Sequence, residues 1–222
     1  MSCADRPIEI LRESGADADV VAHCRAVAGM ALRICPMHPG IDRNLVEAGA
    51  LLHDVGRART HGIRHGLVGA AMLRELGCEE ALVLIAERHV GAGITAKEAA
   101  ALGLPERDYM PVSLEEKVVA HADNLVSGTR HVGVHECMGL ARTRLPPPSL
   151  ARLVTLHFEV FPPVEVSLPT GVEVEPDAVA DGLDALARVK IRPRGRVVEF
   201  SGFEAAQAAE RARAAMGGRA AY

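Results

Sequence analysis

An apolar stretch that ends in two adjacent ionisable residues places the strongest constraint on how this chain folds. Asp42 can cap a helix with the sequence "RNLVEAGALLHDV", in which the apolar positions form one stripe that leads to His53 and Asp54. An imidazole and a carboxylate beside a core are costly unless they are paired, hydrogen-bonded or bound to a metal. The stretch therefore predicts a helix whose end carries a buried polar site.

Four further helices are predicted, and each brings a histidine or an aspartate to its apolar face or its end. The first follows Asp19 as its N-cap, and the last follows Ser113, which forms an S-x-x-E capping-box pattern with Glu116. Between them lie a helix that runs from about residue 65 to Gly77 and the helix "EEALVLIAERHV". The polar residues that these helices carry are His23, His65, His89 and Asp123.

The organisation of the chain changes beyond these helices. The prolines of "RLPPPS" and of "FPP" at 161–163 interrupt any helix, and "VEVSL" and "VVEF" are typical of short strands. The segments "PDAVADGLDALARV" and "FEAAQAAERARAAM" are expected to be helical. The predicted fold is therefore mainly α, a helical bundle over residues 1–145 with a small C-terminal α/β extension over residues 146–222.

Composition narrows the classes of function. Aromatic residues make up 3% of the 222 residues, tryptophan is absent and the net charge is −4, which argues against a base-stacking RNA surface and against general attraction to nucleic acid. We identify no N-terminal targeting segment and no apolar run of the ~18 residues that a membrane span needs. Five cysteines without a C-x-x-C pair predict reduced thiols and a cytoplasmic location.

Six polar residues on separate apolar helices are best explained by one shared site. A single buried histidine is more often a hydrogen-bonded core residue, and this is the role we expect for His38, His121, His131, His135 and His157. We expect His61 to face solvent or substrate. Imidazole and carboxylate ligands suit one or two divalent ions, with Mn, Fe, Mg and Zn not distinguished, and an aspartate can bridge two ions. The six residues are His23, His53, Asp54, His65, His89 and Asp123.

These residues occur in an order that resembles the HD-domain superfamily of metal-dependent phosphohydrolases. "HDVG" is similar to the HDIG variant of its motif, and "HGLVGA" and "AERHV" resemble the additional histidine segments of members with two metals. The resemblance covers roughly residues 18–130. It implies that His23, His53, Asp54 and Asp123 hold one ion, and that Asp54 bridges to a second ion completed by His65 and His89. The chain departs from cyclic-dinucleotide hydrolases of the family because it lacks a GYP motif and a histidine pair at 89.

The resemblance implies hydrolysis of a phosphomonoester or phosphodiester, in a substrate of nucleotide type, by a metal-activated water. Asp54 and Arg57 are the predicted catalytic residues, and the predicted substrate-binding residues are Arg57, Arg64, Arg88 and Asn124. One alternative is a non-catalytic metal- or nucleotide-binding regulatory module associated with an RNA-modifying partner. Another is a structural helical protein with satisfied core histidines. For the extension we expect a role in homodimer formation or in covering the site.

Overall fold

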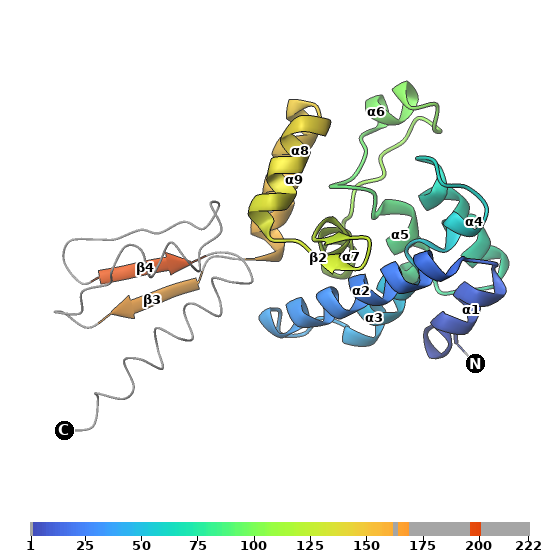
Figure 1. Ribbon diagram of the computed structural model, residues 1–222, viewed down its shortest axis with the longest axis horizontal. Helices are drawn as coiled ribbons and strands as arrows, with labels where there is room; N and C mark the ends of the chain where they lie inside the picture. Colours follow the sequence, from blue (N-terminus) through green and yellow to red (C-terminus); the bar gives the residue numbers. More distant parts are fainter. Residues whose placement is uncertain (1, 162–163, 169–195, 201–222) are drawn as a thin grey trace.

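The computed structural model describes residues 2–161, 164–168 and 196–200, and this part of the chain is mainly helical (Figure 1). The helices are α1 (Pro7–Glu13), α2 (Ala18–Ile34), α3 (Arg43–Leu52), α4 (His65–Glu75), α5 (Glu80–Arg88), α6 (Ala96–Ala101), α7 (Leu114–Asn124), α8 (Val134–Arg144) and α9 (Pro147–Val160). Short 3-10 turns are η1 (Cys3–Asp5), η2 (Cys35–Met37) and η3 (Val55–Ala58). The mainly helical class predicted from the sequence is confirmed.

The strands form two small antiparallel pairs. β1 (Val126–Ser127) pairs with β2 (Arg130–His131), and β3 (Val164–Leu168) pairs with β4 (Arg196–Phe200) in a register that places Val164 opposite Phe200. β3 and β4 confirm the two strands expected in the C-terminal extension. The two helices expected there lie outside the described residues, and the division of the chain at residue 145 stays a prediction.

Side-chain caps begin the helices that carry the site. The carboxylate of Asp42 accepts hydrogen bonds from the backbone N–H groups of Asn44 and Leu45, both at 3.0 Å, which confirms the predicted cap of α3. The predicted cap of α2 at Asp19 is wrong. Asp17 has the extended backbone of an N-cap and accepts from the N–H of Val20 at 2.8 Å, whereas Asp19 lies in the first turn, where its charge favours the helix dipole.

The cap of α7 is only half of the predicted capping box. The Ser113 hydroxyl accepts from the N–H of Glu116 at 3.1 Å, as expected. The Glu116 carboxylate does not return to Ser113 but accepts from the N–H of Val112 and from the Arg88 guanidinium, at 2.9 and 3.0 Å. Arg88 of α5 therefore binds the Glu116 carboxylate that the local sequence pattern assigned to the capping box.

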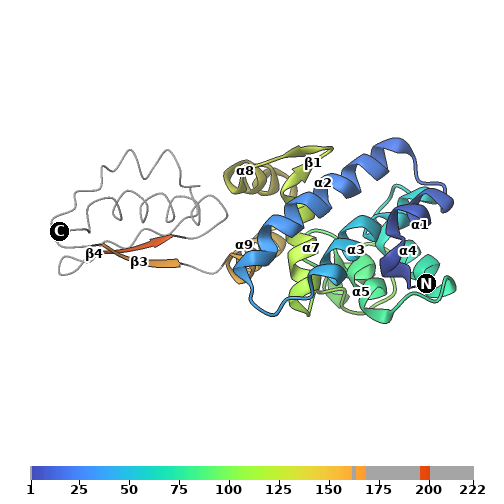
Figure 2. The ribbon, with the colours of Figure 1, turned by 90° about the horizontal axis from the view of Figure 1, so that it is seen from below.

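The core lies where α2 packs along α3 and α7 crosses both helices (Figures 1 and 2). Val27, Ala31 and Ile34 of α2 are buried in one cluster with Val118 and Val119 of α7. α9 joins the same cluster through three buried side chains, although it follows the predicted boundary. These are Leu153, Leu156 and Val160.

The segment Ala18–Met37 is long and apolar enough, by length and composition, to cross a membrane, which the sequence analysis did not anticipate. Seven residues of α2 are buried in the protein, and the helix packs against both α3 and α7. The core helix of a soluble protein meets the same criterion, so this segment is weak evidence for a membrane span.

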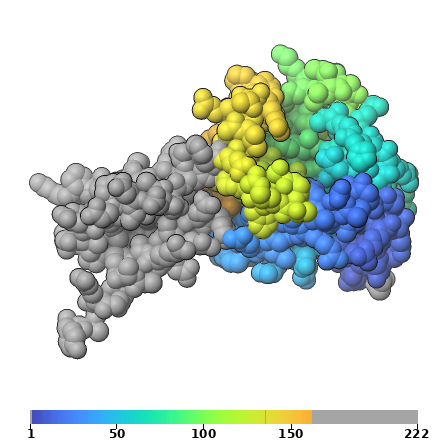
Figure 3. All heavy atoms as spheres, viewed as in Figure 1, coloured from blue at the N-terminus to red at the C-terminus, as the bar shows by residue number. Residues whose placement is uncertain are grey.

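The segment between α5 and α7 forms an excursion from the helical core and contains α6. A backbone bridge between Ile94 and Tyr109 joins its two ends. Arg152 of α9 binds Glu98, in α6, at 2.7 Å. Figure 3 shows the green α6 next to the gold α9 on the outside of the molecule. The excursion starts directly after His89, so it is anchored at the predicted site.

The prediction of five reduced thiols is wrong for one pair. Cys3 and Cys78 form a disulfide, while Cys24, Cys35 and Cys137 lie buried outside it. The bonded residues are 75 positions apart, and the packing of α1, α3 and α4 in one apolar cluster brings them together. Local spacing carries no signal for a pair that only tertiary packing creates.

Most histidines outside the predicted site have the structural roles expected of them. His38 binds the Val160 carbonyl at 2.7 Å, and His131 contacts the Ala26 carbonyl at 3.4 Å. His61 is exposed, and the His135 side chain lies outside the described part. His121 and His157 form a fully buried pair with a 3.1 Å contact between Nε2 of the first and Nδ1 of the second.

The buried histidine pair predicts a loss of stability in acid. Burial lowers the pKa of His157 from an ordinary 6.5 to about 4, so below pH 6.5 the unfolded chain binds a proton that the folded chain excludes. The free energy of unfolding should fall as the pH drops from about 6.5 to about 4. Asn keeps a polar atom near the position of Nδ1, so His157→Asn should flatten this dependence in urea unfolding at a series of pH values. An unchanged slope would contradict the assignment.

Candidate metal centre

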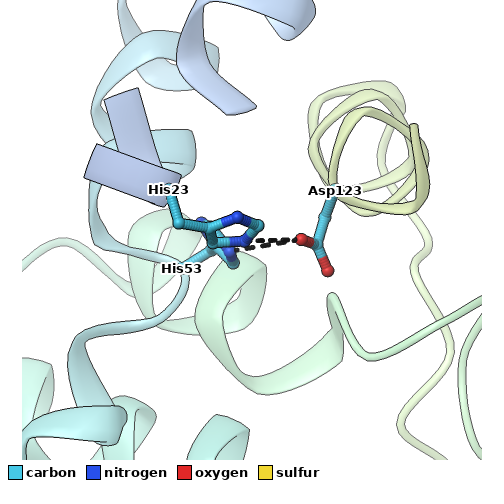
Figure 4. Close-up of side chains that lie close together, drawn as sticks. All are labelled: His23, His53 and Asp123. Carbon is cyan, nitrogen blue, oxygen red and sulfur yellow. Dashed lines mark hydrogen bonds and ion pairs between the residues drawn. The ribbon is translucent and has the colours of Figure 1, made fainter. Parts of the chain in front are cut away.

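The six predicted ligands converge from five helices. α2 carries His23, α4 begins with His65 and α7 carries Asp123, while the remaining three follow the ends of α3 and α5: His53, Asp54 and His89. Figure 4 shows His23, His53 and Asp123 pointing toward one another. Asp123 Oδ1 lies 2.9 Å from His23 Nε2 and 3.6 Å from His53 Nε2. The side chains that helical spacing assigned to inward faces therefore lie together in the structure.

Asp54 lies at the middle of the cluster, and its side chain is only 2% exposed. Its Oδ2 is 3.8 Å from His23 Nε2 and 3.6 Å from His53 Nε2. Its Oδ1 is 3.2 Å from His65 Nε2 and 3.5 Å from His89 Nε2. The two oxygens of one buried carboxylate thus face two separate pairs of histidines.

Backbone carbonyls fix which nitrogen of each histidine faces this carboxylate. Nδ1 contacts the carbonyl of Gly128 for His23, of Ala50 for His53, of Gly62 for His65 and of Ala86 for His89, at 2.7–2.9 Å. A carbonyl can only accept, so Nδ1 must carry the proton, and in a neutral ring Nε2 then presents a lone pair. All four Nε2 atoms are therefore oriented to bind a metal. The hydrogen bonds from Nδ1 to backbone carbonyls are typical of histidines in metal sites.

The charges of the cluster depend on one another. Burial raises the pKa of Asp54, but the surrounding His53 and His89 outweigh it and hold that pKa well below its usual range. Burial lowers the pKa of His53, but the Asp54 charge raises it well above 6.5. For His65, burial and the adjacent His89 lower the pKa to about 4. The cluster keeps an ionised carboxylate that attracts positive charge, which suits a cation.

The residues present fit a bound metal ion. His53 Nε2 and Asp54 Oδ1 are buried and have no hydrogen-bond partner among the described residues. His65 Nε2 and His89 Nε2 lie 3.0 Å apart although both Nδ1 atoms take the carbonyl contacts, so two lone pairs face each other. Two imidazole nitrogens this close together are suited to share one ion, whose nitrogen ligands usually lie ~2.1 Å from it. A divalent ion would satisfy these atoms, and the nitrogen and oxygen donors do not distinguish Mn, Fe, Mg and Zn.

Close glycine contacts bring His65 to the centre. A Cβ atom on Gly56 would lie 2.0 Å from the His65 carbonyl oxygen and 2.5 Å from the Gly69 nitrogen. A Cβ on Gly66 would lie 3.0 Å from the Ala86 carbonyl of α5. The first turn of α4 therefore packs directly on the backbones of η3 and α5. This role of the glycines was not predicted, although glycines three apart in "HGLVG" share one helix face.

The predicted substrate-binding residues divide into two groups. Arg57 contacts the centre itself, since its Nε donates to Asp54 Oδ2 and its side chain is 31% exposed. The others bind the protein: Arg64 donates to the Gly103 carbonyl, Arg88 to Glu116, and Asn124 to the carbonyls of Gly91 and Ala120. Substrate contacts by these four residues stay predictions.

A backbone contact that the sequence analysis missed holds His23. The carbonyl of Gly128, in the turn between β1 and β2, lies 2.8 Å from His23 Nδ1. Gly128 has a φ of +62°, which favours glycine in this tight turn. The two residues are 105 positions apart, so no local pattern could have indicated the contact.

Comparisons with known proteins identify the family of this chain. The HD domain model matches residues 20–128. An uncharacterised protein of Methanocaldococcus jannaschii is 52% identical over 148 residues, 64% of this chain and 88% of that protein. A tRNA (cytidine(56)-2'-O)-methyltransferase of Picrophilus torridus is 42% identical over 156 residues, 70% of this chain but only 46% of the methyltransferase. The crystal structure of the HD domain of L. monocytogenes phosphodiesterase PgpH has a TM-score of 0.43 and 15% identity, over 70% of this chain and 95% of that one. The chain belongs to the HD-domain family.

Proposed function

We propose that this HD-domain protein is a metal-dependent phosphohydrolase that cleaves a phosphomonoester or phosphodiester in a substrate of nucleotide type. The observation that carries the proposal is the Asp54 carboxylate, whose two oxygens each face a pair of histidine Nε2 atoms at 3.2–3.8 Å. A carboxylate shared in this way is suited to bridge two ions. Two-ion centres are well matched to phosphate ester hydrolysis because they can stabilise both the attacking and the leaving oxygen.

The protein's own residues have distinct tasks in this proposal. His23, His53, Asp54 and Asp123 would hold one ion, and His65 and His89 would complete a second site around Asp54. Bound ions supply an acidified water and screen the charge of the phosphoryl oxygens. Arg57 orients Asp54 through Nε, and its Nη groups, which have no partner among the described residues, bind a phosphoryl oxygen.

A panel of phosphate esters tests the proposal. The purified chain is supplied in turn with Mn, Fe, Mg and Zn ions and assayed on p-nitrophenyl phosphate, bis-p-nitrophenyl phosphate and dinucleotides. We expect the unaltered chain to release product only with metal, and a chelator should abolish this release. Asp54→Asn, which keeps the size of the side chain, should release no product with any metal. No turnover with any metal by a chain that demonstrably binds ions would contradict a hydrolase.

Arg57→Lys should weaken substrate binding without removing metal. A lysine keeps the positive charge but has one nitrogen, which cannot reproduce the separate contacts of Nε and Nη. A charge-assisted hydrogen bond of about 1.5–3 kcal/mol corresponds to a roughly 10- to 100-fold lower kcat/KM. Steady-state kinetics and metal content are measured together.

Arg59→Lys is the matched control for Arg57→Lys. Arg59 lies in the same segment, is exposed and makes no side-chain hydrogen bond or ion pair among the described residues. It should leave both the kinetics and the metal content unchanged. If Arg57→Lys behaves like this control, Arg57 has no part in binding the phosphate.

A second candidate function is a binding module that turns nothing over. The methyltransferase relative favours it, because a matching domain there forms part of a protein named for RNA modification. In that case nucleotides or tRNA would raise the melting temperature of the chain without release of phosphate. A cytoplasmic location and a homodimer also stay proposals.

A further inference from the structure

The Cys3–Cys78 disulfide joins the N-terminal arm, which consists of η1 and α1, to the helix pair α4–α5. This pair carries the candidate ligands of the second ion. Cys3 lies in η1, and Cys78 lies in the turn between α4 and α5. α4 begins with His65, and His89 directly follows α5. The bond therefore restrains the turn between α4 and α5. His65 and His89 lie at the opposite end of this helix pair.

The two bonded sulfurs belong to the accessible cysteines of the chain. Cys3 and Cys78 are partly exposed, whereas Cys24, Cys35 and Cys137 are buried. The residues next to Cys78 on both sides, Gly77 and Glu79, are exposed. A dissolved thiol can thus reach this pair more readily than any of the other three sulfurs.

Few other polar contacts join the arm to this turn. The Ser2 hydroxyl donates to Glu79 at 2.6 Å, in an exposed contact that contributes little to stability. Further along the arm, Ile10 and Leu11 are buried in the apolar cluster that also contains Leu73 of α4. Cys3 and Ala4 also pack against this cluster. Opening the disulfide would therefore leave the arm held mainly by apolar contacts, and the α4–α5 turn would lose its covalent restraint.

We propose that the Cys3–Cys78 pair is a thiol–disulfide switch that sets how tightly the chain holds the second metal ion. The inference rests on the proposed two-ion centre. Reduction takes place with a dithiol: the sulfur–sulfur bond breaks, each sulfur gains a proton, and the dithiol loses two electrons and two protons as it forms its own disulfide. The α4–α5 pair transmits the change because tight packing at Gly66 keeps His65 in register with α5.

The test compares the oxidised and reduced forms of the full chain. Thiols are counted under denaturing conditions, the reductant is removed without air, and Mn²⁺ alone is titrated into metal-free protein with free Mn²⁺ read by electron paramagnetic resonance. We expect three thiols and two bound ions in the oxidised form. We expect five thiols in the reduced form, with at least fivefold weaker binding of the second ion and a melting temperature lower by about 5–10 °C.

Two variants complete the test. Cys3→Ser should bind the second ion as weakly as reduced protein, with or without the dithiol. Ser2→Ala removes the hydrogen bond to Glu79 and the N-cap hydrogen bond from the N–H of Ala4 but keeps the disulfide, so it should respond to the dithiol as the unaltered chain does. Five thiols without reductant, or equal affinity for the second ion in both forms, would overturn the switch. If reduction lowered the melting temperature but not this affinity, the disulfide would have only a structural role.

The outcome can be separated from that of the proposed function because ion binding is measured without substrate. Redox-dependent binding of the second ion by a chain that hydrolyses no phosphate ester would support the switch and contradict the hydrolase. One ion in both forms would overturn the switch and still allow a hydrolase with a single ion.

Discussion

Replacing Asp54 with alanine should remove both metal ions and phosphate ester hydrolysis together. The change removes the oxygens that face the two histidine pairs and the negative charge that favours cations in a buried site. Ions in such sites supply several kcal/mol of transition-state stabilisation, so kcat/KM should fall by at least ~1000-fold. Metal content and kinetics are measured on the same preparation.

His89→Ala is the contrasting variant. It removes one nitrogen from the His65 side of the carboxylate and leaves His23, His53 and Asp123 in place. It should lose only the second ion, whereas Asp54→Ala should lose both. If Asp54→Ala kept its full metal content and rate, the assigned centre would be wrong.

Among glycine-to-alanine changes at this site, Gly56→Ala should lower the free energy of unfolding the most. The new Cβ would lie 2.0 Å from the His65 carbonyl oxygen and 2.5 Å from the Gly69 nitrogen, and both are backbone atoms that cannot rotate away. Overpacking of this kind costs more than about 3 kcal/mol, or roughly 10 °C in melting temperature. Because α4 must move, the second ion should also be lost.

Gly62→Ala is the matched control for Gly56→Ala. It adds the same methyl group in the segment before α4, where the nearest atom is the Thr60 hydroxyl at 3.9 Å. The backbone carbonyl of residue 62, which contacts His65 Nδ1, is kept. The melting temperature and metal content of this variant should therefore stay close to those of the unaltered chain. Equal melting temperatures for the two variants would show that the close approach of η3 and α4 does not position His65.

The convergence of the candidate metal ligands could be predicted because local rules decide where these side chains lie. Helical periodicity places His23 and Asp123 on the faces that pack inward, and Asp42 fixes the start of the helix that ends at His53. The caps also limit the precision of such predictions. Asp17 and Asp19 are both good N-cap residues, and the position where α2 begins decides between them.

The rest depends on contacts between distant positions. Arg88 is bound to Glu116, 28 residues away, and the disulfide joins residues 75 apart. Nothing in the neighbourhood of these residues distinguishes an arginine free for phosphate from one that neutralises a buried carboxylate. The close approach of Gly56 to α4 likewise appears only when two backbones are placed side by side.

The number of metal ions per chain tests the central claim most directly. It is measured by elemental mass spectrometry on protein purified without chelator or a histidine-rich tag, and again after reconstitution with Mn or Fe ions. We expect close to two ions per chain in the oxidised protein, held by the six candidate ligands around Asp54. No bound ion after reconstitution would contradict it.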